Sequence, residues 1–76
     1  MEKLSININT EYIKLDQLLK FSGLAESGAD AKDMILSEMV SVNSEPCAMR
    51  GKKIRGGDTV TVEFEDETVE ITVGEE

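Results

Sequence analysis

The chain lacks several of the side chains from which catalytic and metal sites are most often built. It contains no histidine, no tryptophan and a single cysteine, Cys47. A structural zinc site made of Cys and His ligands is therefore excluded, and so is acid–base or nucleophilic catalysis that depends on histidine. A lone cysteine cannot form an internal disulfide, which agrees with a reducing compartment. We expect no enzymatic activity, no bound metal and no cofactor.

Membrane and secretion signals are also missing. No apolar run approaches the ~20 residues that a membrane helix needs, and residues 1–5 lack the basic and then apolar order of a secretory signal. A length of 76 residues leaves room for one domain. We therefore expect a single cytoplasmic domain over residues 1–76, with no membrane partner and no small-molecule substrate.

The distribution of charge is uneven. With 16 acidic and 8 basic residues the net charge is −8, which taken alone argues against binding to nucleic acid. Residues 63–76, however, contain acids and no base, whereas half of all the basic residues stand close together, namely Arg50, Lys52, Lys53 and Arg55. The sequence therefore predicts a local positive site in an acidic protein.

Two short helices are predicted after an initial strand. Alternating apolar and polar residues indicate a strand over residues 5–9. Three leucines at helical spacing indicate a helix from about Leu15 to Ser22, ended by Gly23 in the left-handed conformation. Ser27 begins a second helix, in which Asp30 completes a pattern resembling a capping box. The buried stripe of that helix is expected to be Ala31, Met34, Ile35 and Met39.

The second half of the chain is predicted to form strands. Val40 and Val42 indicate one strand, followed by a turn over residues 43–46. Residues 59–73 indicate a hairpin that turns at Asp66-Glu67 and buries one apolar face. In that register Phe64 faces Val69, Val62 faces Ile71, Val60 faces Val73 and Glu63 faces Glu70. The expected class is α+β: a short N-terminal strand, two consecutive helices, and a small, mainly antiparallel sheet ending in a hairpin.

Four short motifs occur in the order found in one RNA-binding family. They are Lys14-Leu15-Asp16 with the pair Leu18-Leu19, Ser27 followed by Ala31-Lys32, Val40-Ser41-Val42-Asn43, and Lys53-Ile54-Arg55-Gly56-Gly57-Asp58. In this pattern the chain resembles the RNA-binding domain named after small-subunit ribosomal protein S-four, also called the alpha-L motif. The match covers about residues 12–64. The N-terminal strand and the short length are similar to the small stand-alone bacterial members, the YaaA-like or YbcJ-like group. The family favours glycine where this chain has Glu38 and Ser44.

The resemblance implies that the helix pair and the basic loop after it bind RNA, and that the domain catalyses no reaction. The basic loop is also the first candidate on chemical grounds, because Arg offers a planar fork to phosphate oxygens and Lys a compact charge. A solvated loop that keeps a small domain soluble is the alternative. Lys14 and Lys32 become candidates through the resemblance, provided that the fold brings them beside the loop. The candidate RNA-binding residues are therefore Lys14, Lys32, Arg50, Lys52, Lys53 and Arg55.

Structured RNA is the expected partner, and family analogy favours ribosomal RNA during ribosome assembly. Readers of single strands usually stack bases on exposed aromatic rings. This chain has three aromatic residues, and we expect two of them, Phe21 and Phe64, to point into the core. The alternative is a protein-interaction module whose acidic hairpin binds a basic partner. A ubiquitin-like carrier would need a C-terminal Gly-Gly, whereas this chain ends in Gly-Glu-Glu.

Overall fold

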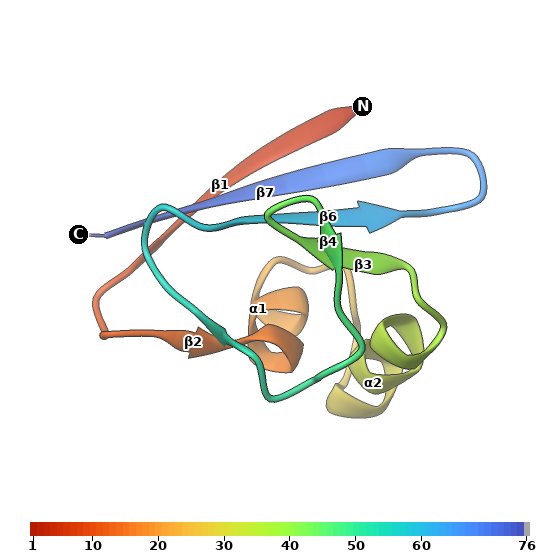
Figure 1. Cartoon of the computed structure of the whole chain (residues 1–76), viewed down its shortest axis with the longest axis horizontal. Helices are drawn as coiled ribbons and strands as arrows, with labels where there is room; N and C mark the ends of the chain where they lie inside the picture. Colours follow the sequence, from red (N-terminus) through yellow and green to blue (C-terminus); the bar gives the residue numbers. More distant parts are fainter. Residues whose placement is uncertain (76) are drawn as a thin grey trace.

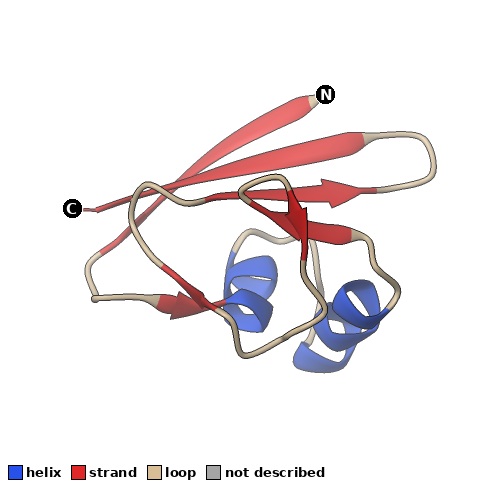
Figure 2. Cartoon of the chain, in the orientation of Figure 1, coloured by secondary structure: helices blue, strands red, loops and turns tan. Residues whose placement is uncertain are grey.

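A five-stranded sheet carries both helices on one of its faces (Figures 1 and 2). The structure is a computed structural model, and it describes residues 1–75. The strands of the sheet lie in the order β1-β7-β6-β3-β4, and a second, two-stranded sheet pairs β2 with β5. The predicted α+β class is confirmed. The elements are β1 (Glu2–Ile8), β2 (Ile13–Lys14), α1 (Leu15–Phe21), α2 (Gly28–Leu36), β3 (Val40–Val42), β4 (Glu45–Pro46), β5 (Lys53–Ile54), β6 (Thr59–Glu63) and β7 (Thr68–Glu75).

Local signals correctly predicted where both helices begin and where α1 ends. The hydroxyl of Ser27 accepts a hydrogen bond from the backbone N–H of Asp30 at 3.2 Å, which satisfies one of the free donors of the first turn of α2. Ser22 closes α1, and Gly23 follows it with φ +85°. That left-handed conformation suits glycine, which has no Cβ to clash with the carbonyl.

Three residues other than glycine adopt the left-handed conformation, and two of them, Glu38 and Ser44, stand where the resemblance implies glycine. Glu38 follows α2 with φ +63°, while Asn43 and Ser44 link β3 to β4 with φ +52° and +71°. Positive φ at both central positions is the signature of a type I′ hairpin turn. The predicted turn over residues 43–46 is therefore the tip of a small hairpin, in which Val42 pairs with Glu45.

The hairpin formed by β6 and β7 exists, but its predicted register is wrong by two residues. Val60 pairs with Ile71 and Val62 with Val69. The connection contains four residues, 64–67, and is closed by a hydrogen bond from the N–H of Phe64 to the carbonyl of Glu67 at 2.7 Å. A two-residue turn at Asp66-Glu67 would need positive φ at Asp66, and in a type I′ turn at Glu67 as well, a conformation that favours residues such as Asn-Gly.

The corrected register keeps the same side chains inside, because a shift by two preserves the face of each residue. It also separates the predicted like-charged pair: Glu63 now faces Thr68, and Glu70 faces Thr61. Beyond this hairpin, β7 pairs with β1 in parallel, with Leu4 beside Ile71. Nothing local in the sequence indicates this pairing, which joins the two ends of the described chain.

The prediction that both phenylalanines point into the core is wrong for Phe21 and only partly met by Phe64. Phe21 is 71% exposed, because it lies off the stripe by which α1 packs. Phe64 is half-buried in the loop after β6 and packs against the edge of the core. Of the expected stripe of α2, Ala31 and Ile35 are fully buried and Met34 is half-buried. Met39 is half-buried too, but it lies beyond Leu36, where α2 ends, so its assignment to the helix is wrong.

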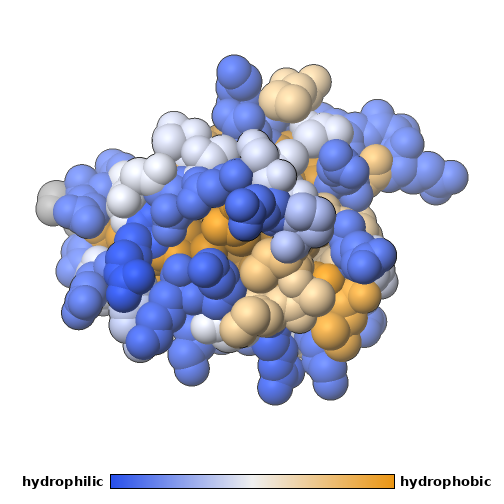
Figure 3. Space-filling model, viewed as in Figure 1, coloured by the Kyte–Doolittle hydropathy of each residue, from blue (hydrophilic) through white to orange (hydrophobic). Residues whose placement is uncertain are grey.

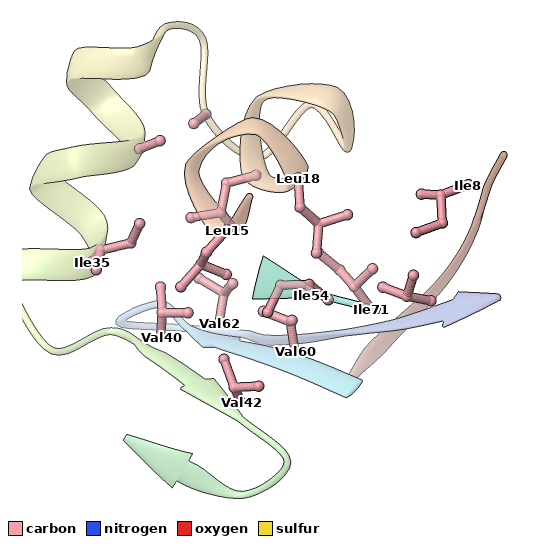
Figure 4. Packing of buried hydrophobic residues seen from close by; sticks show 14 residues of the cluster. Ile8, Leu15, Leu18, Ile35, Val40, Val42, Ile54, Val60, Val62 and Ile71 are labelled. Atoms are coloured by element: carbon pink, nitrogen blue, oxygen red, sulfur yellow. The ribbon is translucent and has the colours of Figure 1, made fainter. Parts of the chain in front are cut away.

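The core fills the space between the helices and the inner face of the sheet (Figure 4). Helix α1 contributes its three leucines, and the strands contribute mainly valines. Ile54 of β5 is fully buried among them, although the residues on either side of it are exposed cations. The core therefore anchors the basic segment with Ile54 inside and with Lys53 and Arg55 outside. The largest fully buried side chains are Leu15, Leu18, Leu19, Ile35, Val40, Ile54, Val60, Val62, Val69, Ile71 and Val73.

Candidate nucleic-acid interface

Two lysines from distant parts of the chain lie directly opposite each other. Lys14 of β2 pairs with Lys53 of β5 in the antiparallel two-stranded sheet, and both are exposed. Side chains at directly opposed positions have their Cβ atoms about 5 Å apart. The fold therefore brings two positive charges together on one face.

The basic loop is fastened to the beginning of α1 by backbone hydrogen bonds. The N–H of Leu15 donates to the carbonyl of Lys52 at 2.9 Å, and the N–H of Asp16 donates to the carbonyl of Arg50 at 3.1 Å. These carbonyls satisfy two N–H groups that the helix itself leaves free. The capping residue Lys14 makes no side-chain cap bond, and Asp16 Oδ1 in the first turn accepts from the N–H of Gln17 at 2.8 Å. Arg50 and Lys52 are thus held beside Lys14.

The direction of Lys53 is set by two neighbours. Burial of Ile54 turns the side chains before and after it outward, and the Lys53 ammonium lies 5.0 Å from the centre of the Tyr12 ring. This distance is within the range of a cation–π interaction, which is worth about 0.5–1 kcal/mol at an exposed site. Tyr12 therefore supports a lysine of the candidate surface, a role that sequence reasoning missed.

A groove of about 710 Å³ opens beside these cations. Lys52, Lys53 and Arg55 line one part of it, and the segment from Val42 to Met49 lines the other. This segment and the chain leading to β6 cross the front of Figure 1, and Figure 3 shows apolar surface at the centre of the same face with hydrophilic side chains around it. We call the exposed cations Lys14, Lys52, Lys53 and Arg55 the basic patch.

Asn43 and Asp58 hold the two sides of the groove together. The Asn43 amide donates to Asp58 Oδ1 at 3.1 Å and its Oδ1 accepts from the N–H of Thr59 at 2.9 Å. Asp58 Oδ2 accepts from the N–H of Arg55 at 2.8 Å. The sequence marks Asn43 and Asp58 only as turn residues. In the structure they position Arg55.

The electrostatics of Asp58 follow from this position. The hydrogen bond from the Arg55 N–H is the main cause that lowers the pKa of Asp58 below its ordinary 3.8. Partial burial opposes the shift, while the Asn43 amide and the charges of Lys52 and Arg55 add to it. Asp58 is therefore a structural carboxylate, ionised at neutral pH, inside a positive surface.

Five of the six predicted residues come together, and one does not. Hydrogen bonds to the start of α1 hold Arg50 and Lys52 near Lys14. The β2–β5 pair places Lys53 opposite Lys14. Arg55 lines the groove together with Lys52 and Lys53. Lys32 is exposed on α2. Within residues 1–75, none of these hydrogen bonds, strand pairings or groove contacts includes Lys32.

The acidic loop between β6 and β7 lies away from the basic patch. It contains Glu65, Asp66 and Glu67, all exposed. Along the longest axis of the molecule, this loop is at the right-hand end in Figure 1, whereas β2 lies toward the left. The acidic loop is therefore separated in space from the basic patch, whereas Glu75 at the end of β7 lies against Gly56, next to Arg55.

Two negative findings concern the described part of the chain only. Among residues 1–75, no helix has both the length and the apolar character needed to cross a membrane. The same residues contain no group of three or more Cys, Asp or Glu side chains placed to hold a metal ion.

Comparison with known proteins assigns the family. The family model of the S4 domain matches residues 6–72. The chain is also similar to the probable ribosome maturation protein RlbA of Bacillus subtilis (strain 168). The two are 43% identical over 58 residues, which cover 76% of this chain and 82% of the relative. The chain belongs to the S4 domain family, the RNA-binding family that its four motifs resemble.

Proposed function

We propose that this protein binds structured RNA without catalysing a reaction, and that its target is ribosomal RNA during ribosome maturation. The observation that carries the proposal is the convergence of Lys14, Lys52, Lys53 and Arg55 on one surface of an acidic protein. Arg50 extends this surface at the start of α1. The S4 family membership and the similarity to a probable ribosome maturation protein support the choice of target. A cytoplasmic location fits that role.

Two features of the placement of Lys14 favour a bound anion, in addition to the negative charge that Asp16 supplies in the first turn of α1. Lys14 faces a second lysine, and like charges directly opposed across two strands are destabilising. It also stands at the N-terminal end of α1, where the helix dipole disfavours a cation. A phosphate group between Lys14 and Lys53 would relieve both effects. The arrangement therefore suits a polyanion better than it suits the free protein.

Binding on this surface is mainly electrostatic. Contacts to phosphates position a protein on RNA, whereas contacts to bases specify the sequence. Four phosphate contacts predict a slope of about −3 to −4 in log affinity against log salt, so affinity should fall roughly a hundredfold between about 50 and 200 mM salt. The free protein repels RNA elsewhere through its acidic loop, which favours one orientation of docking.

A charge-reversal experiment tests the proposal. The double variant Lys53→Glu/Arg55→Glu should lose salt-dependent binding to ribosomal RNA fragments, while Glu63→Lys, at the far end of β6, should keep it. Crosslinking in cells followed by sequencing of the bound RNA identifies the target. Retention of binding by the double variant would refute the basic patch as the site. Absence of salt-dependent RNA binding in the unmodified protein would favour the alternative, in which the acidic hairpin binds a basic protein partner.

A further inference from the structure

The two edges of the five-stranded sheet are protected to very different degrees. At one edge, β4 is two residues long and contains Pro46, which has no backbone N–H to donate. At the other edge, β1 extends over the seven residues Glu2–Ile8 and pairs with β7 without a bulge (Figure 1). An edge strand of this kind presents unpaired N–H and C=O groups to another strand. We propose that β1 pairs in antiparallel fashion with β1 of a second copy of this chain, which joins the two five-stranded sheets into one.

The free edge of β1 is left open by the rest of the described chain. The backbone hydrogen bonds of loops and turns include none from residues 2–8. Among the helices and strands of residues 1–75, β7 is the only element in extensive contact with β1. β1 contains neither proline nor glycine, and its single lysine, Lys3, stands near one end. The devices that usually protect an edge strand, such as proline, a bulge or a central lysine, are therefore missing from β1.

The apolar face of β1 is incompletely covered. Leu4, Ile6 and Ile8 alternate along the strand and lie on the face that packs against the core. Ile71 of β7, which pairs with Leu4, is fully buried, whereas Leu4 and Ile6 are only half-buried. A further strand along this edge would cover both side chains, as β1 itself covers Ile71.

The sequence of β1 is complementary to itself in antiparallel pairing. A two-fold register centred on Ser5 is the one in which all seven residues pair, and it places Ser5 opposite Ser5 of the second copy. Leu4 of each copy then faces Ile6 of the other copy on the apolar face. Cross-strand apolar pairs of this kind stabilise an antiparallel sheet. Because opposed side chains lie on the same face, the helices of both copies would cover the same face of the joined sheet.

Charge favours a second copy over a strongly charged partner strand. β1 carries one acid and one base, Glu2 and Lys3, in a chain whose net charge is −8. A strongly basic or acidic strand therefore gains no net attraction from the side chains of this edge. In the two-fold register Lys3 faces Asn7 and Glu2 faces Ile8, so no like charges are opposed. Because both copies are acidic overall, screening by salt should strengthen this pairing, whereas it should weaken RNA binding.

Analytical ultracentrifugation of the protein without RNA tests the pairing. The mean mass should rise toward twice that of the monomer as the protein concentration is raised. Ser5→Lys should abolish this rise, because two lysines would then be directly opposed at the centre of the pair. Thr72→Lys is the matched control: Thr72 pairs with Ser5 on the adjacent strand β7, so the same charge is added one strand away from the edge, and the rise should persist. Both positions are exposed, so both variants should keep the circular dichroism spectrum of the unmodified protein.

Pairs of variants test the register. Ser5→Lys and Ser5→Glu should each be monomeric alone, while their mixture should dimerise, because opposite charges then face each other. In a Cys47→Ser background, Ser5→Cys should form a disulfide-linked dimer, since opposed Cα atoms lie about 4.5–5.5 Å apart. Asn7→Cys, which faces Lys3 of the second copy, should not.

Two results would overturn the inference. One is a monomer at every concentration of the unmodified protein, which would leave the edge to a strand of another protein. The other is a dimer that persists in Ser5→Lys as it does in Thr72→Lys. Either result would leave the proposed function standing, because that function is tested by RNA binding.

Discussion

Replacing Lys14 by glutamine should make the free protein more stable and the RNA complex weaker. The opposed charges of Lys14 and Lys53 cost about 0.2–1 kcal/mol, and a cation at the start of a helix costs about 0.3–1 kcal/mol. Both groups are exposed, so screening by solvent reduces these values. The substitution should therefore raise the free energy of unfolding by about 0.5 kcal/mol.

That gain corresponds to a measurable shift in thermal unfolding. For a domain of this size, 1 kcal/mol moves the midpoint by about 4–8 °C, so Lys14→Gln should unfold about 2–4 °C higher than the unmodified protein. The shift should shrink at high salt, where exposed charges are screened. Loss of one phosphate contact should lower the salt slope of RNA binding by about 1. Circular dichroism follows the unfolding, and fluorescence anisotropy of a labelled RNA follows the binding.

Lys3 provides a control that changes the net charge by the same amount. Lys3 of β1 lies opposite Glu70 of β7, so an acid attracts the charge of Lys3. The charge of Lys14, in contrast, is repelled by Lys53. Lys3→Gln should therefore slightly lower the midpoint and leave RNA binding unchanged. The reasoning is refuted if Lys14→Gln destabilises the protein as Lys3→Gln does, or if both substitutions weaken RNA binding equally.

Three further substitutions test the backbone and the groove. Gly57 has φ +95°, so Gly57→Ala should lower the free energy of unfolding in urea by about 1–2 kcal/mol, whereas Gly51→Ala should not. Glu38 has φ +63°, so Glu38→Gly should raise that free energy by about 0.5–1 kcal/mol; a decrease would contradict the strain assigned to this residue. The lowered pKa of Asp58 means that its contribution to stability is complete above pH 3.8 and is lost as the pH falls through the lower native-state value. Asp58→Asn should therefore be less stable at neutral pH but lose less stability on acidification to about pH 2, and a pH profile parallel to that of the unmodified protein would contradict this.

Short-range features of the fold could be predicted from the sequence. The leucine spacing of α1, the Ser27 cap of α2 and the left-handed Gly23 each depend on neighbours within one helical turn. Alternation identified the inner face of β6 and β7, because burial in a strand follows a period of two. The register failed because alternation cannot distinguish shifts of two residues, and the loop geometry decides between them.

Long-range pairings could not be predicted in this way. The parallel pairing of β1 with β7 joins the two ends of the chain, and the β2–β5 pair is only two residues long on each side. The long-range contacts within the candidate site could not be predicted either. The cluster Arg50–Arg55 is visible in the sequence, but the apposition of Lys14 and Lys53 is not. Phe21 was misplaced because its apolar character predicts burial, while its position off the helix stripe prevents it.

A nuclear magnetic resonance titration of the protein with a ribosomal RNA fragment tests the central claim most directly. If the basic patch is the docking surface, the largest changes in backbone amide shifts should involve Lys14 and residues 50–55, with little change in the acidic loop over residues 64–67. Changes concentrated in that loop, with the β2–β5 pair unaffected, would contradict the account.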